Sequence, residues 1–262
     1  LCMKRQRLLC LLLLILSCSG VQFASDQPAF SPPVSPDYLD AFLPLKPNHQ
    51  RDRWGVIIGL NAEERHRGNI SLAYQVMLES GLKYDNIIIL DISSSSSIFP
   101  KTDTTSLASV RFLMEELAKI VEDEDDLIIY VTGHGTRFEN RAQLVLNPSE
   151  HMESSEFLAS LEAIRPGRGL VIFDQCFWGA ELHPKSCRWT TITVSKPMEE
   201  SKELVFPRQF WLSFRNGVTS IITSFAIAQN NDAAKNPGEN APVLKQRTCG
   251  IDENQGAGKI QW

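Results

Sequence analysis

The chain has 262 residues, of which 43% are hydrophobic and 22% charged. This length corresponds to one large or two small domains, the apolar content excludes a fully disordered chain, and six cysteines are too few for a disulfide scaffold. A net charge of -5 argues against a nucleic-acid-binding protein, which usually presents a basic surface.

The first feature in chain order is a candidate signal peptide at residues 1–19. Three basic residues (Lys4, Arg5 and Arg7) precede an apolar run at 8–16 and small residues at 17–20. This order is typical of a secretory signal peptide, and the run is too short for a membrane-spanning helix of about 20 residues. A buried apolar helix is the alternative. The sequence therefore predicts an exported protein, secreted or periplasmic.

Residues 15–18 also resemble the cleavage box of a bacterial lipoprotein. Cleavage before Cys18 would make Cys18 the lipidated first residue, which would attach the protein to a membrane. Lipoprotein and plain secretion stay open as alternatives. A Pro- and Ser-rich linker is predicted at 20–50, a globular domain at 51–235 and a loose polar tail at 236–262.

From residue 51, short apolar runs alternate with amphipathic segments. Strands are expected at 54–60, 86–90, 126–132, 169–174 and 190–194, with a short hairpin strand at 143–146. Helices are expected at 69–80, 105–121, 154–164, 206–217 and 219–229. The pattern predicts an α/β fold: a mostly parallel sheet with helices on both faces. Phosphate-binding glycine motifs are absent, so no nucleotide or other cofactor is expected.

Asn69, Ile70 and Ser71 form a glycosylation sequon if the source is a eukaryote. Asn69 also stands at the expected start of the helix at 69–80, where asparagine is a good N-cap. We favour the cap. Gly81 is placed to end the same helix.

Two reactive side chains follow predicted strands directly. His134 comes after the strand at 126–132, and Cys176 after the strand at 169–174. In α/β sheets, ligands bind beyond the carboxyl ends of the strands, so the two side chains meet if these strands are neighbours. An imidazole raises the thiolate fraction of an adjacent thiol and can protonate a leaving amine. The pattern predicts a Cys176–His134 dyad, with the amides of Gly135 and Cys176 as oxyanion donors.

Other interpretations of this pair remain. A histidine and a buried cysteine at strand ends can be purely structural. A metal site is less favoured, because neither residue has a second Cys or His at ligand spacing. Outside the leader the cysteines are Cys176, Cys187 and Cys249, and this odd number leaves at least one of them without a disulfide partner in the chain. Cys187 and Cys249 are candidates for a disulfide.

The segments Thr132-Gly133-His134-Gly135 and Asp174-Gln175-Cys176, each after an apolar strand, resemble the caspase-like group of cysteine peptidases (caspases, metacaspases, legumains and gingipains). Within this group the legumain family is the most similar. The segments that carry this likeness are 54–60, Arg65-His66, Ala73-Tyr74-Gln75 and 81–88, and the resemblance covers roughly residues 52–230. It implies a caspase-like fold and a thiol protease that works through a thioester acyl-enzyme.

The resemblance also implies roles for single residues. His134 corresponds to the catalytic base and Cys176 to the nucleophile. Legumains orient the histidine with an Asn two residues before their Arg-His pair. Glu63 stands at that place, so only the dyad is expected, with Glu63 as a candidate orienting residue.

The resemblance places the P1 specificity pocket at Asp174, two residues before Cys176. Arg65 at its legumain position favours a P1 Asn, or Asp at acid pH, and His66 is a candidate pocket wall. A pocket of the metacaspase type, without such an Arg, takes P1 Arg or Lys. Thr193 and Ser195 end the fifth strand, where the family pairs an extended substrate by strand addition.

Three functions therefore stay open, and the first is expected. They are a cysteine endopeptidase (a hydrolase), a transpeptidase or ligase on the same fold, and an inactive scaffold or binding module. The expected partner is a protein or peptide substrate. Oligomeric state is not predicted.

Overall fold

The computed structural model describes residues 51–60, 62–92, 102–139, 141–176, 183–195, 205–216, 220–235 and 242–246. The chain divides into two units, Leu1–Pro32 and Pro33–Trp262, and every described residue belongs to the second. The predicted signal peptide, the linker at 20–50 and Cys18 lie outside the described residues. Within the described part of the chain, no helix is long and apolar enough to span a membrane.

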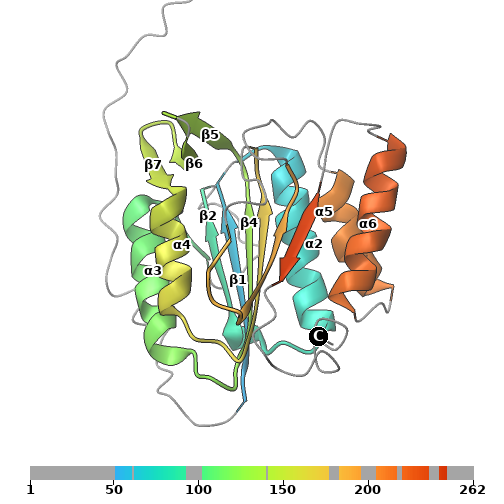
Figure 1. The fold of residues 1–262 in the computed structure, drawn as a ribbon, viewed down its shortest axis with the longest axis horizontal. Helices are drawn as coiled ribbons and strands as arrows, with labels where there is room; N and C mark the ends of the chain where they lie inside the picture. The colour runs from blue at the N-terminus through green and yellow to red at the C-terminus, as the bar shows by residue number, and fades with distance from the viewer. Residues whose placement is uncertain are drawn as a thin grey trace, which may run out of the picture. The chain divides into compact units, whose positions relative to one another are not determined.

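A seven-stranded sheet forms the centre of the fold, in the order β10-β9-β8-β4-β1-β2-β3 (Figure 1). The strands are β1 (Arg53–Gly59), β2 (Ile87–Asp91), β3 (Thr102–Asp103), β4 (Asp126–Thr132), β8 (Arg168–Asp174), β9 (Trp189–Thr193) and β10 (Val243–Gln246). All neighbouring pairs are parallel except β9 and β10, which are antiparallel. The predicted α/β fold with a mostly parallel sheet is confirmed, and it is consistent with a caspase-like fold.

Helices cover both faces of this sheet (Figure 1). One face packs against α3 (Leu107–Ile120) and α4 (Ser154–Ala163), and the other against α2 (Glu64–Glu79), α5 (Val205–Arg215) and α6 (Ile221–Lys235). Successive side chains of a strand point to opposite faces, so Val56 and Ile58 join the first cluster and Ile57 joins the second. Burial on both faces explains why these strands are continuous apolar runs in the sequence.

Helix α2 differs from the prediction at its start. It begins at Glu64 with Glu63 as N-cap residue, so Asn69 lies inside the helix, buried, and is not a cap. The first turn carries only charged and polar residues, and it therefore lacks the apolar periodicity that reveals a helix. The predicted end is confirmed: Gly81 follows the helix with a φ of 88°, a left-handed conformation that favours glycine.

A second, three-stranded antiparallel sheet begins directly after His134. It consists of β5 (Gly135–Phe138), β6 (Arg141–Asn147) and β7 (Glu150–Glu153), in that order. The predicted hairpin strand at 143–146 is thus the middle of β6. Leu144 and Met152 of this sheet pack into the core beside α3 and α4.

Strand β10 was not expected. The sequence places residues 243–246 in a loose polar tail, but they form an edge strand paired with β9. The prediction of a loose tail is therefore wrong for these residues. An edge strand needs main-chain partners on one side only, and a polar segment can supply them without an apolar pattern. The rest of the tail at 236–262, apart from Pro242, lies outside the described residues.

Candidate active site

The sheet brings the two reactive residues to one edge. β4 and β8 are parallel neighbours, and their last residues, Thr132 and Asp174, are register partners. His134 and Cys176 each follow two residues later, at the carboxyl ends of adjacent strands. The amide of Gly133 donates to the carbonyl oxygen of Asp174 over 3.2 Å, and this bond connects the segment after β4 to the end of β8.

Gly135 lies against the backbone of Cys176. A Cβ atom added at Gly135 would overlap the carbonyl oxygen of Cys176, so only glycine fits at this position. The side-chain amide of Gln175 donates to the carbonyl oxygen of His134 over 3.3 Å. The segment after β4 and the segment after β8 therefore touch where the dyad is expected. Cys176 is half-buried and is a thiol, not a disulfide.

The main chain at Gly135 has a defined orientation. The carbonyl oxygen of His134 accepts from the amide of Val145 in β6 over 3.2 Å. Within one peptide unit the N–H points opposite to the C=O, so the N–H of Gly135 points away from β6. This direction suits the expected role of that amide as an oxyanion donor.

Glu63 connects His134 to the start of α2. Its Oε1 lies 3.0 Å from Nε2 of His134, and its Oε2 accepts from Nε of Arg65 over 2.7 Å. All three side chains are about half exposed. A neutral His134 with its proton on Nε2 satisfies the contact and keeps a lone pair on Nδ1. Glu63 thus occupies the place expected of an orienting residue, and Nδ1 is the nitrogen suited to act as base.

A buried hydrogen-bond network lies behind this site. Oδ2 of Asp174 accepts from the hydroxyls of Tyr130 and Thr132, each over 2.7 Å. Thr132 Oγ1 also lies 2.8 Å from Nδ1 of His66. Because the Thr132 hydroxyl donates to Asp174, it accepts from His66, which places the proton of His66 on Nδ1.

Burial shifts both ionisable ends of this network. Burial raises the pKa of Asp174 to about 6, although the hydrogen bonds from Thr132 and Tyr130, the nearby amide of Asn69 and the charge of Arg65 lower that pKa. Burial also lowers the pKa of His66 to about 4, and the charges of Arg65 and His134 add to this effect while Glu63 opposes it. His66 is therefore neutral at neutral pH.

Three buried polar atoms of this cluster have no hydrogen bond of good geometry: Asp174 Oδ1, His66 Nε2 and Asn69 Nδ2. Unsatisfied buried polar groups are costly, so each of these atoms needs a partner such as a bound water, an ion or a polar group of a ligand. The predicted pocket residues Asp174 and His66 are thus together, whereas Arg65 is at the surface in an ion pair with Glu63. Asn69 was missed because its position in the sequence suggested a cap.

The predicted substrate edge at 193–195 is partly covered. Thr193 is the register partner of Phe173 in β8 and of Val243 in β10, so it has a strand on each side. An added strand can pair with this edge only beyond Thr193. Ser195 is buried, and its hydroxyl donates to the carbonyl oxygen of Gln175 over 2.9 Å.

Other features of the described residues lie apart from the site. Trp189 is buried in the core, where its Nε1 donates to Leu161. Cys187 is disulfide-bonded, and its predicted partner Cys249 lies outside the described residues. In the described ranges, no group of three or more His, Cys, Asp or Glu side chains could hold a metal ion.

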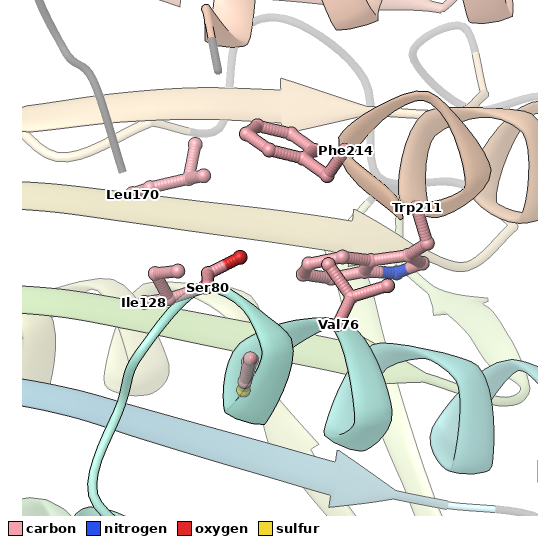
Figure 2. A pocket seen from close by; sticks show the side chains of 7 residues that line it. Val76, Ser80, Ile128, Leu170, Trp211 and Phe214 are labelled. Atoms are coloured by element: carbon pink, nitrogen blue, oxygen red, sulfur yellow. The ribbon is translucent and has the colours of Figure 1, made fainter. Parts of the chain in front are cut away.

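Figure 2 shows a small apolar pocket between α2, α5 and the sheet. Its lining residues are Val76, Met77, Ser80, Ile128, Leu170, Trp211 and Phe214. Ile128 and Leu170 lie in the amino-terminal halves of β4 and β8, so the pocket is nearer the opposite end of the sheet from His134. Trp211 meets the ring of Tyr130 edge-on, with centroids 5.3 Å apart.

No protein-family model matches the chain, and a search of curated proteins also finds no match.

Proposed function

We propose that the chain is a cysteine endopeptidase that hydrolyses peptide bonds through Cys176 and His134. The observation that carries this proposal is the contact between the segment after β4 and the segment after β8. Gly135, next to the histidine, lies against the backbone of Cys176 so closely that no side chain fits. A nucleophile and a base on touching segments, with a carboxylate on the far nitrogen of the base, is the general pattern of an activated nucleophile.

The proposed reaction uses the side chains of Cys176 and His134 and two main-chain amides. Nδ1 of His134 takes the proton of the Cys176 thiol, and the thiolate attacks the scissile carbonyl carbon. The N–H groups of Gly135 and Cys176 stabilise the oxyanion. The tetrahedral intermediate collapses to a thioester as the C–N bond breaks and His134 protonates the leaving amine. Water, deprotonated by His134, then hydrolyses the thioester and restores the thiol.

The proposed P1 residue is Asn. The buried cluster offers two acceptors, Asp174 Oδ1 and His66 Nε2, and one donor, Asn69 Nδ2. A carboxamide has two N–H donors and one acceptor oxygen, so it matches this set. The resemblance to legumains supports the same residue. Protonation of Asp174 at acid pH would add a donor and admit a P1 Asp.

Fluorogenic peptides with Asn, Asp, Arg or Lys at P1 test this proposal, assayed between about pH 4 and pH 8 with Cys176→Ala as control. Cleavage after Asn that depends on Cys176 is expected. Cleavage after Arg or Lys would keep the dyad but overturn the proposed pocket. If no peptide is cleaved, added amine nucleophiles distinguish a ligase, which forms a new amide, from an inactive scaffold, which forms none.

A further inference from the structure

Within the part of the chain that the structure describes, strand β5 is paired along one edge only, and its other edge starts at the candidate active site. Among the described strands, β5 pairs with β6 alone. The bond from Val145 to the carbonyl of His134 shows that His134 directs its main-chain groups toward β6. Main-chain groups alternate in direction along an antiparallel strand, so Thr136 and Phe138 also point toward β6. The N–H and C=O groups of Gly135 and Arg137 therefore point to the unpaired edge.

The position of this edge relates it to one part of a substrate. β5 begins one residue after His134, and Gly135 lies against Cys176. His134 is the group that protonates the leaving amine in the proposed reaction, so the leaving side of the substrate passes beside His134. A strand advances about 3.3 Å per residue, and β5 therefore extends about 13 Å from the site.

The far end of β5 carries an apolar side chain that the fold does not bury. Phe138 is 56% exposed, the largest value among the exposed large apolar residues of the described part of the chain. It stands at the tip of the hairpin, between two exposed arginines, Arg137 and Arg141. Arg141 forms an ion pair with Glu139. Phe138 is therefore accessible to a substrate that extends along the hairpin from the candidate active site, where an aromatic ring supplies a large apolar contact surface.

We propose that the unpaired edge of β5 binds the leaving-group side of the peptide substrate as an added strand. The carbonyl oxygen of Gly135 and the N–H and C=O groups of Arg137 supply the main-chain hydrogen bonds, and Phe138 contacts an apolar side chain three or four residues past the scissile bond. Main-chain pairing then provides affinity, and the contact at Phe138 provides selection. This inference rests on the proposed function, and it adds a binding region to it.

Two kinds of substrate, three peptides in all, test the inference. One is a short fluorogenic peptide that ends in a dye directly after P1. The other is an internally quenched peptide with the same unprimed residues and four residues on the leaving side, with either Leu or Ser as the fourth. The enzyme variants are Phe138→Ala and, as control, Tyr84→Ala. Tyr84 is 45% exposed and precedes β2 at the opposite end of the sheet.

Phe138→Ala should lower kcat/KM about tenfold for the long peptide with Leu, the loss expected when one aromatic contact is removed. It should leave the short peptide and the long peptide with Ser nearly unchanged. Tyr84→Ala should change none of the three. N-methylation of the leaving-side amides, one at a time, should weaken cleavage at alternate residues only, because an added strand pairs through every second residue.

Three results would overturn the inference. Equal kcat/KM of wild type and Phe138→Ala on all peptides, with no alternation on N-methylation, would show that β5 does not bind substrate. Reduced binding of Phe138→Ala to phosphatidylglycerol–phosphatidylcholine vesicles, with unchanged cleavage, would make the hairpin tip a membrane contact. Absence of cleavage of all three peptides would overturn the proposed function itself, and this inference with it.

Discussion

Oε1 of Glu63 lies 3.0 Å from Nε2 of His134, across 71 positions of sequence. The same carboxylate accepts from Nε of Arg65. The contact with Arg65 therefore orients the Glu63 side chain, and Glu63 in turn orients the imidazole of His134. Glu63 is the N-cap residue of α2, yet its side chain makes no capping hydrogen bond to the helix. Its side chain is therefore paired with the side chains of His134 and Arg65 and not with the main-chain N–H groups at the start of α2.

Replacement of Glu63 should slow catalysis more than it weakens folding. Glu63→Ala removes the partner of Nε2, and we expect kcat to fall by about tenfold or more, the contribution of one positioned hydrogen bond. Glu63→Asn, which keeps an acceptor oxygen in the side chain, should retain more activity than Glu63→Ala. Kinetics on the preferred P1 peptide measure both effects.

The matched control is Glu64→Gln, which removes the adjacent exposed carboxylate in the first turn of α2. It should leave kcat unchanged. A Glu63→Ala variant with full kcat and a lower Tm would show that Glu63 supports only the helix start, and would contradict a role in orienting His134.

The dyad gives the sharpest expectation. Cys176→Ala and His134→Ala should each abolish turnover and leave the fold intact, because Cys176 is only half-buried and His134 is half exposed. Circular dichroism and Tm check the fold, and the P1 peptide panel checks activity. Peptidase activity retained by Cys176→Ala would contradict the mechanism.

The strands of the central sheet could be predicted because burial on both faces leaves a direct mark on the sequence. The strand expected at 126–132 has the bounds of β4, and its residues are all buried. His134 and Cys176 could be placed at one edge because parallel neighbouring strands end together. Local pattern and topology were sufficient for these features.

Contacts between residues that are far apart in the sequence produce no such local pattern. The start of α2 is charged, and contacts to His134 and Arg65 engage Glu63 there. Strand β10 depends on main-chain pairing with β9, which covers Thr193. The hydrogen bond of Tyr130 to Asp174 joins side chains 44 positions apart. Sequence periodicity reports burial along one element, so it cannot reveal pairs of this kind.

Asp174 should determine P1 selection, and its replacement should lower cleavage after Asn relative to cleavage after Asp. Asp174→Asn replaces the acceptor Oδ1 with an amide that also donates. We expect kcat/KM for a P1 Asn peptide to fall about tenfold or more at neutral pH, while the ratio of Asp to Asn cleavage rises. Wild type should show the same rise in the ratio only as pH falls through the Asp174 pKa of about 6. An unchanged ratio in Asp174→Asn would place the P1 pocket elsewhere.

Asp174 and His66 should also give the free energy of unfolding two pH dependences of opposite sign. The pKa of Asp174 rises on folding from 3.8 to about 6, so its contribution to stability is present below pH 4 and is lost as pH rises through 6. The pKa of His66 falls on folding from 6.5 to about 4, so its contribution is present above pH 6.5 and is lost as pH falls through 4. Between these values the two effects oppose each other.

Single variants should separate the two slopes. In His66→Gln only Asp174 remains, and the free energy of unfolding should rise as pH is lowered from 6 to 4 relative to Asp174→Asn. In Asp174→Asn only His66 remains, and the free energy should fall over the same range. Denaturant titrations of both variants across this range measure the difference between their free energies of unfolding. Contributions from titratable groups that both variants share cancel in this difference. Parallel curves would contradict the assignment of these shifts to the pair.

Gly135 and Gly68 form a matched pair for the contact that supports the proposed function. A Cβ at Gly135 would overlap the carbonyl oxygen of Cys176, and backbone atoms cannot move aside as a flexible side chain can. Gly135→Ala should therefore displace the segment after His134 and lower kcat/KM by about a hundredfold, the loss typical of a misplaced catalytic group.

A Cβ at Gly68, inside α2, meets no atom within 4 Å. Gly68→Ala should leave kcat/KM unchanged and stabilise the fold by up to about 1 kcal/mol, because alanine favours the helix. Measurement well below both Tm values separates misplacement from unfolding, and a fully active Gly135→Ala would show that catalysis does not need the close approach of the segment after β4 and the segment after β8.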